Sequence, residues 1–111
     1  MGHELQDRVS MEIARRIAAE LPTRPDWIAL ARENLRRWTE RNHDAPGLLR
    51  CYAEWQAILE KPVEEVCRIL TMENDEGQRL RQNSPFPGAL PYKLICEIKS
   101  RRWAESRVCA Q

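Results

Sequence analysis

The chain has 111 residues, of which 42% are hydrophobic and 32% charged, so it can build one core and is not expected to be disordered. Eighteen Lys and Arg residues nearly balance seventeen Asp and Glu residues, and the formal net charge of +1 excludes the strong positive field of a dedicated nucleic-acid binder. The longest apolar run, 27–31, is far shorter than the roughly 20 residues that cross a bilayer. We expect a single domain over 1–111 and no membrane span.

The N-terminal segment has neither a basic region nor an apolar stretch, so we expect no secretory signal and a cytoplasmic location. In that compartment the cysteines are expected to be reduced thiols. They lack the close pairing of C-x-x-C, which argues against a metal site, and we predict no metal and no cofactor. The four are Cys51, Cys67, Cys96 and Cys109.

The first half of the chain predicts two helices. Hydrophobic residues recur every four positions from Leu5 to Leu21, which indicates an amphipathic helix over 4–20 that Pro22 stops. Thr23 and Asp26 have the spacing of a capping box, so the second helix is expected over 24–42.

The middle of the chain predicts a third and a fourth helix. Asp44 is the expected N-cap of the third helix, with Pro46 in its first turn. Its apolar face is broader than a surface helix needs, so we expect this helix to be central. A break at Lys61 and Pro62 precedes the fourth helix, whose first-turn glutamates suit the positive end of the helix dipole.

The last third predicts a short helix, a connector and a final helix. A polar stretch is expected to form a short helix around 75–82, and the Pro-rich segment 84–91 a structured connector. The segment 92–103 fits a helix that begins after Pro91, although alternating apolar residues also fit a strand. A lone strand would have no partner, so we favour the helix. The predicted fold class is all-α, a compact bundle of five to six short helices.

The sequence offers no catalytic signature. Its histidines are His3, near the terminus, and His43, in a predicted turn, and no nucleophile-elbow, zinc-protease, dinucleotide or phosphate-loop motif occurs. Carboxylates within 64–76 are interpreted as a solvated acidic face. We therefore predict a protein that is not an enzyme.

Charge is uneven along the chain. Residues 60–76 hold six acidic and two basic residues, a net of −4, whereas 79–111 hold seven basic and two acidic residues, a net of +5. These stretches can pair with each other within one subunit or across a dimer. The basic stretch also permits an alternative function in nucleic-acid binding, with a tryptophan stacking on a base. The candidate contacts are Lys93, Lys99, Arg101, Arg102 and Arg107.

Aromatic residues suggest a protein interface. Trp27 and Trp103 lie near predicted helix ends and are expected to be partly exposed, and tryptophan often dominates binding energy. Phe86, between two prolines, either fills the bundle core or docks another chain. The predicted function is a small cytoplasmic interaction or regulatory module without catalytic activity, acting through a protein partner or self-association as a homodimer.

Overall fold

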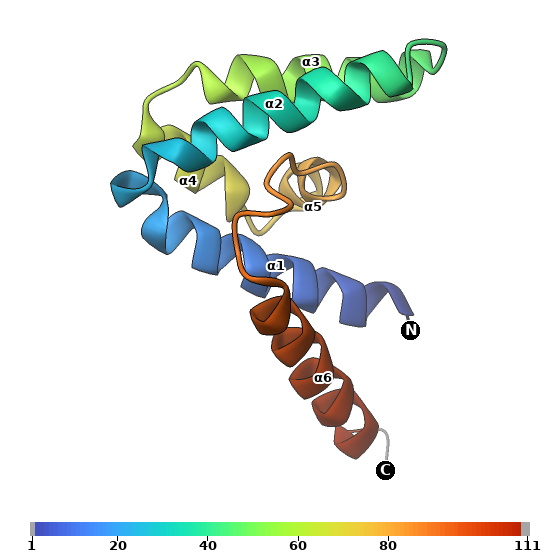
Figure 1. The fold of residues 1–111 in the computed structure, drawn as a ribbon. Coiled ribbons are helices and arrows are strands. Elements are labelled where there is room, and N and C mark those ends of the chain that lie inside the picture. Colours follow the sequence, from blue (N-terminus) through green and yellow to red (C-terminus); the bar gives the residue numbers. More distant parts are fainter. Residues whose placement is uncertain (1, 110–111) are drawn as a thin grey trace.

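The computed structural model describes the backbone of residues 2–109 and the side chains of residues 4–105. Within that range the chain is all-α and contains no strand, so the predicted helical bundle is confirmed, as is the helical form of 92–103 (Figure 1). The elements in chain order are α1 (Gly2–Glu20), the 3-10 turn η1 (Leu21–Thr23), α2 (Pro25–Arg41), α3 (Pro46–Leu59), α4 (Val63–Leu70), α5 (Asp75–Arg81) and α6 (Tyr92–Cys109).

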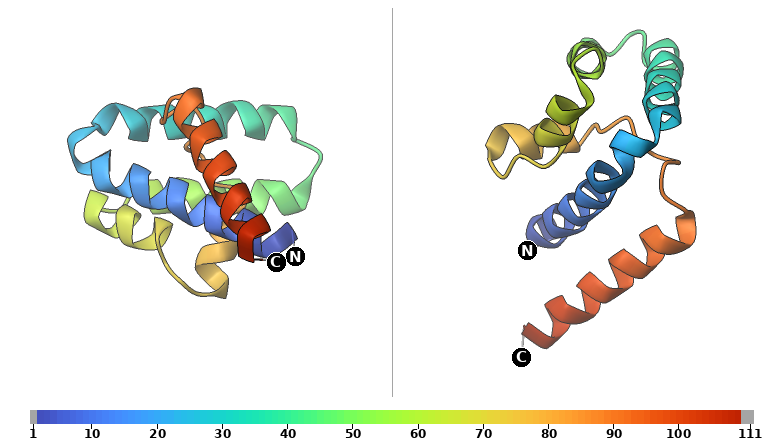
Figure 2. Two further views of the ribbon diagram at one scale, coloured as in Figure 1. Left: turned by 90° about the horizontal axis from the view of Figure 1, so that it is seen from below. Right: turned by 90° about the vertical axis from the view of Figure 1, so that its left-hand side faces the viewer.

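The helices pack around α1. α2 and α3 form an antiparallel hairpin on one side of the molecule, and α6 lies on the opposite side of α1 (Figures 1 and 2). The main contacts of α1 are with α4, α5 and α6, whereas those of α3 are with α2 and α4. α1 thus contacts more helices than α3, the third helix that was expected to be central, but α3 contributes four buried side chains to the core.

Trp55 of α3 is the centre of the main core. Its side chain is fully buried, and its indole Nε1 donates a hydrogen bond to the carbonyl oxygen of Leu80, 3.0 Å away. The edge of Phe86 meets its ring at an 85° angle, with the centroids 6.3 Å apart. One side chain thus joins α3 to α5 and to the connector before α6.

Two predicted helix caps are absent. The Thr23 hydroxyl donates to the carbonyl oxygen of Glu20, 2.9 Å away, because Thr23 ends the 3-10 turn rather than preceding a helix. Arg24 and Ala45 occupy the N-cap positions of α2 and α3 without a side-chain hydrogen bond, and a proline follows each of them. A proline at N1 has no N–H to satisfy, which reduces the need for a capping side chain.

The segment between α4 and α5 packs closely against Gly77, in the first turn of α5. A Cβ atom at this position would lie 2.3 Å from the carbonyl oxygen of Met72, so only glycine fits without a backbone shift. Asn74 caps α5, because its side-chain oxygen accepts a hydrogen bond from the Gly77 amide at 2.8 Å. The short helix predicted for this region is confirmed with bounds Asp75–Arg81.

The molecule exposes more surface than its mass requires. Its accessible area is 7353 Å², against about 6,400 Å² for a typical folded monomer of 13.1 kDa. The radius of gyration is 14.6 Å, against about 13 Å for a compact chain of this length. The peripheral position of α6 accounts for the larger radius of gyration (Figure 2). No helix in the described part of the chain is long and apolar enough to span a membrane.

Candidate binding groove

A groove of about 1040 Å³ runs between α1, the connector 84–91 and α6. Its α1 wall is the apolar stripe predicted from the sequence, with side chains four residues apart on one helix face. These side chains are Leu5, Val9, Ile13 and Ile17. Only Ile17 is fully sheltered, and the other three are partly buried along the opening. The apolar stripe of the predicted amphipathic helix therefore lines an open surface along most of its length.

The α6 wall ends in two exposed aromatic side chains. Tyr92, Lys99 and Trp103 lie within about 40° of one another around α6, since each residue advances the helix by about 100°. Tyr92 is 82% exposed and Trp103 is 56% exposed. The buried residue Ile98 lies on a different face of the same helix. One face of α6 is thus buried, while an aromatic and cationic face borders the groove.

Asn34 holds the connector that contributes the remaining lining. Its side-chain nitrogen donates hydrogen bonds to the carbonyl oxygens of Pro85 and Pro87, both at 3.0 Å. Its oxygen accepts a hydrogen bond from Arg37. Gly88 has a φ of 95°, a left-handed conformation that glycine adopts without strain. These interactions fix the backbone that places Phe86 and Leu90 against the groove.

The charged lining residues are both cationic. They are Arg81 and Lys99, and among the side chains that the structure describes the lining contains no Asp, Glu, His or Cys. The Arg81 Nη1 donates to the carbonyl oxygens of Leu70 at 3.1 Å and Met72 at 2.7 Å. Burial lowers the pKa of Arg81, because desolvation disfavours the charged guanidinium. Lys99 forms no ion pair with any residue whose side chain is described.

Glu12 fastens α6 to α1. Its carboxylate, 12% exposed, pairs with Arg101 and, at 2.8 Å, with the Nε of Arg102. Burial raises the pKa of Glu12, but the two arginines outweigh that effect, so its net pKa lies below the ordinary value. The cluster holds the C-terminal half of α6 beside α1.

Two of the three predicted interface aromatics are buried. Trp27 is only 4% exposed, so the expectation of partial exposure is wrong for this residue. It packs into the core, and the Arg24 guanidinium lies 4.8 Å from its ring centroid. Phe86 is 2% exposed and contacts Trp55, which matches the core alternative rather than docking. Only Trp103 is partly exposed, as expected.

The predicted nucleic-acid contacts do not form one stripe. Lys93 and Lys99 point in directions about 120° apart around α6, and Arg101 lies on a third side. Arg101 and Arg102 are engaged by Glu12. The side chain of Arg107 lies outside the described residues, as do those of Cys109 and His3. The described cations are thus poorly arranged to follow a phosphate backbone.

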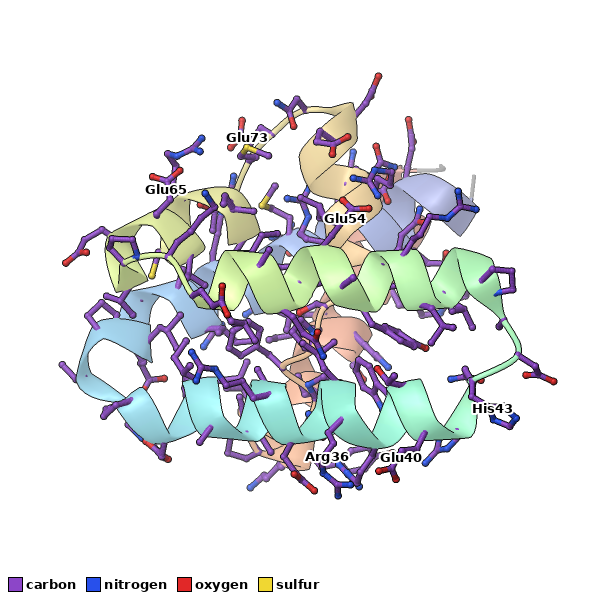
Figure 3. All side chains as sticks on the ribbon, turned by 90° about the horizontal axis from the view of Figure 1, so that it is seen from above. Arg36, Glu40, His43, Glu54, Glu65 and Glu73 are labelled. Atoms are coloured by element: carbon purple, nitrogen blue, oxygen red, sulfur yellow. The ribbon has the colours of Figure 1, made fainter. Side chains whose placement is uncertain are left out.

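The acidic stretch is solvated and locally paired. Glu65 and Glu73 point outward (Figure 3), and they pair with Arg68 and Arg15, respectively. Glu76 pairs with Arg79, which also reaches Glu54 of α3 at 2.7 Å. Among the described side chains, the Glu76–Arg79 pair within α5 is the one ion pair that joins the acidic stretch 60–76 to the basic stretch 79–111. Arg36 and Glu40 likewise pair on the outer side of α2 (Figure 3).

A second cleft of about 450 Å³ lies between α1 and α5 and is lined by polar side chains, in which acidic and basic residues occur together. Gln78 donates to Asp7 at 2.5 Å, and Arg15 pairs with Glu73.

Among the described residues, no cluster of three or more His, Cys, Asp or Glu side chains is arranged for a metal ion. Burial, followed by the charge of Glu64, raises the pKa of the Cys67 thiol, and its Sγ lies 3.4 Å from the Ala18 carbonyl oxygen.

Sequence reasoning did not single out Asn34 or Tyr92. Asn34 had a usable signal, because it is a polar residue beside the apolar positions Ala31 and Leu35 of a helix. Tyr92 shares its helix face with Trp103, eleven positions away, but the spacing alone does not tell whether that face is covered.

Comparison of the chain with protein-family models, curated proteins and solved structures finds no match.

Proposed function

We propose that this protein is a non-enzymatic interaction module whose binding site is the groove between α1, the connector and α6. The observation that carries the proposal is the groove itself, an apolar channel of about 1040 Å³ bordered by the exposed side chains of Tyr92 and Trp103. Exposed apolar patches of this kind mark binding surfaces in soluble proteins, and Trp and Tyr are frequent energetic anchors there.

The chemistry of the lining supports binding rather than catalysis. Its polar residues are amides, hydroxyls and two cations, namely Gln6, Ser10, Gln82, Ser84, Arg81 and Lys99. A nucleophilic serine needs an adjacent base, and within residues 4–105 neither a histidine nor a carboxylate lines the groove. A cytoplasmic setting remains part of the proposal, as does a protein partner.

Site-specific photocrosslinking in the cells that make the protein tests this function. A benzophenone amino acid is placed at Trp103 or Tyr92, and at Leu48 of α3 as a matched exposed apolar position outside the groove. We expect discrete protein adducts from the two groove positions and none from Leu48. Adducts of equal yield at all three positions, or none at either groove position, would overturn the proposal.

A further inference from the structure

The cationic lining indicates which partner the groove accepts. We propose that its occupant is an amphipathic helix of another protein, with an apolar stripe flanked by acidic side chains that meet Lys99 and Arg81. The inference rests on the proposed function and adds the conformation and charge of the partner. The argument follows from the dimensions, the charges and the symmetry of the groove.

The dimensions fit about two to three turns of helix. A helix rises about 5.4 Å per turn, and each helical wall of the groove is about three turns long. The walls are of similar length, since Leu5–Ile17 on α1 span about 18 Å and Tyr92–Trp103 on α6 span about 16 Å. Helices bind such grooves through apolar side chains spaced three and four residues apart.

The charges favour acidic flanks. Elsewhere on the described surface, arginines meet carboxylates, as Arg36 does with Glu33 and Glu40 and Arg79 with Glu54 and Glu76. Arg81 and Lys99 differ, because neither has a carboxylate within ion-pair distance among the described side chains, although Arg81 also lines the second cleft, where the charges of Asp7 and Glu73 act on it. An acidic side chain entering the apolar groove would therefore gain attraction in partly desolvated surroundings without displacing an existing ion pair.

Symmetry disfavours a second copy as the occupant. A two-fold contact presents the same patch on both subunits. Two grooves facing each other would bring together four cations from the two Arg81 and Lys99 pairs, and no carboxylate of the described part of the lining would offset them. Like charges in an interface raise its free energy. A heterologous acidic partner avoids that repulsion.

Binding of designed peptides to the full chain tests the inference. Fluorescein-labelled helical peptides of about 12 residues carry one fixed leucine stripe, flanked by Glu, Gln or Lys, and fluorescence anisotropy gives each Kd. We expect the Glu peptide to bind at least about tenfold more tightly than the Lys peptide, with Gln between them. Raising the salt from about 0.05 M to about 0.5 M is expected to reduce the difference.

Charge reversal on the protein supplies the matched control. Lys99→Glu is expected to raise the Kd of the Glu peptide at least about tenfold and to lower the Kd of the Lys peptide. Lys93→Glu makes the same charge change on α6 outside the groove and should change neither Kd by more than about twofold. Both side chains are exposed, so neither variant is expected to disturb folding.

The outcomes separate this inference from the proposed function. Equal affinity for the three peptides, or equal effects of the two lysine variants, overturns the acidic partner but leaves the groove as a binding site. Failure of all peptides to bind overturns the helical occupant, while groove crosslinks to another protein would still support the proposed function. A dimer by light scattering that Trp103→Ala dissociates overturns the inference in favour of a second copy.

Discussion

The α2–α3 hairpin and α6 both carry aromatic residues at helical spacing, but they differ in how far these side chains are buried. In the hairpin Trp27, Tyr52 and Trp55 are buried. On α6 the side chains of Tyr92 and Trp103 remain exposed. The hairpin is covered from several directions, whereas the main helical contact of α6 is with α1. Burial of an aromatic side chain thus depends on how many neighbours its helix has.

The largest effect is expected at Trp55. Trp55→Ala should lower the free energy of unfolding by about 3–5 kcal/mol, because it leaves a cavity and removes the hydrogen bond to the Leu80 carbonyl. Urea unfolding followed by circular dichroism measures the change. A loss below about 1 kcal/mol would show that the hairpin aromatics are not the main core, and would remove the contrast with α6.

Asn34 links the two regions, since it joins α2 to the connector before α6. Asn34→Ala should cost about 1–3 kcal/mol, because the carbonyl oxygens of Pro85 and Pro87 lose their donor, in one buried and one partly buried hydrogen bond. Hydrogen exchange is expected to rise in 84–91. Asn34→Asp keeps the size but removes the donor, so it should resemble Ala rather than the parent. An Asp variant as stable as the parent would contradict the role assigned to these hydrogen bonds.

The Glu12 cluster should make the attachment of α6 sensitive to pH. Its arginine partners hold the folded-state pKa of Glu12 below 4.5, so this stabilisation is present above that value and is lost as pH falls through the folded-state pKa. Glu12→Gln should cost about 1–2 kcal/mol at neutral pH, and the difference from the parent should shrink on acidification. Urea midpoints at neutral and acidic pH measure it. A difference that grows in acid would contradict the assignment.

The smallest effect on stability is expected at Trp103. Trp103→Ala should change the free energy of unfolding by less than about 0.5 kcal/mol, because over half of the side chain is already exposed. The affinity of the Trp103→Ala variant for the Glu-flanked peptide should nevertheless fall at least about tenfold. Thermal melts and anisotropy titrations on the same sample check both values. A large loss of stability would mean that Trp103 is a structural residue like Trp55.

The positions of the helices were predictable because their signals are local. Four-residue periodicity identified α1, and prolines marked the starts of α2 and α3 to within a few residues. The caps were less predictable. Thr23 and Asp44 had suitable chemistry, but an intervening 3-10 turn and prolines at N1 changed which residue preceded each helix.

The candidate site was only partly predictable. Trp103 was identified from its residue type and position, but Trp27 was misplaced on the same reasoning, and Tyr92 and the opening beside Val9 were not anticipated. A sequence shows that a helix face is apolar without showing what covers it. Whether that face becomes core or groove depends on residues distant in the chain.

By itself, the sequence determined an all-helical chain, its helix boundaries and the apolar stripe of α1, since each follows from the spacing of neighbouring residues. The tertiary structure decided that α1 is the hub and that Asn34 fixes the connector. It also decided that one face of α6 stays uncovered. These features depend on contacts between residues far apart in sequence, where packing, hydrogen bonding and charge act together.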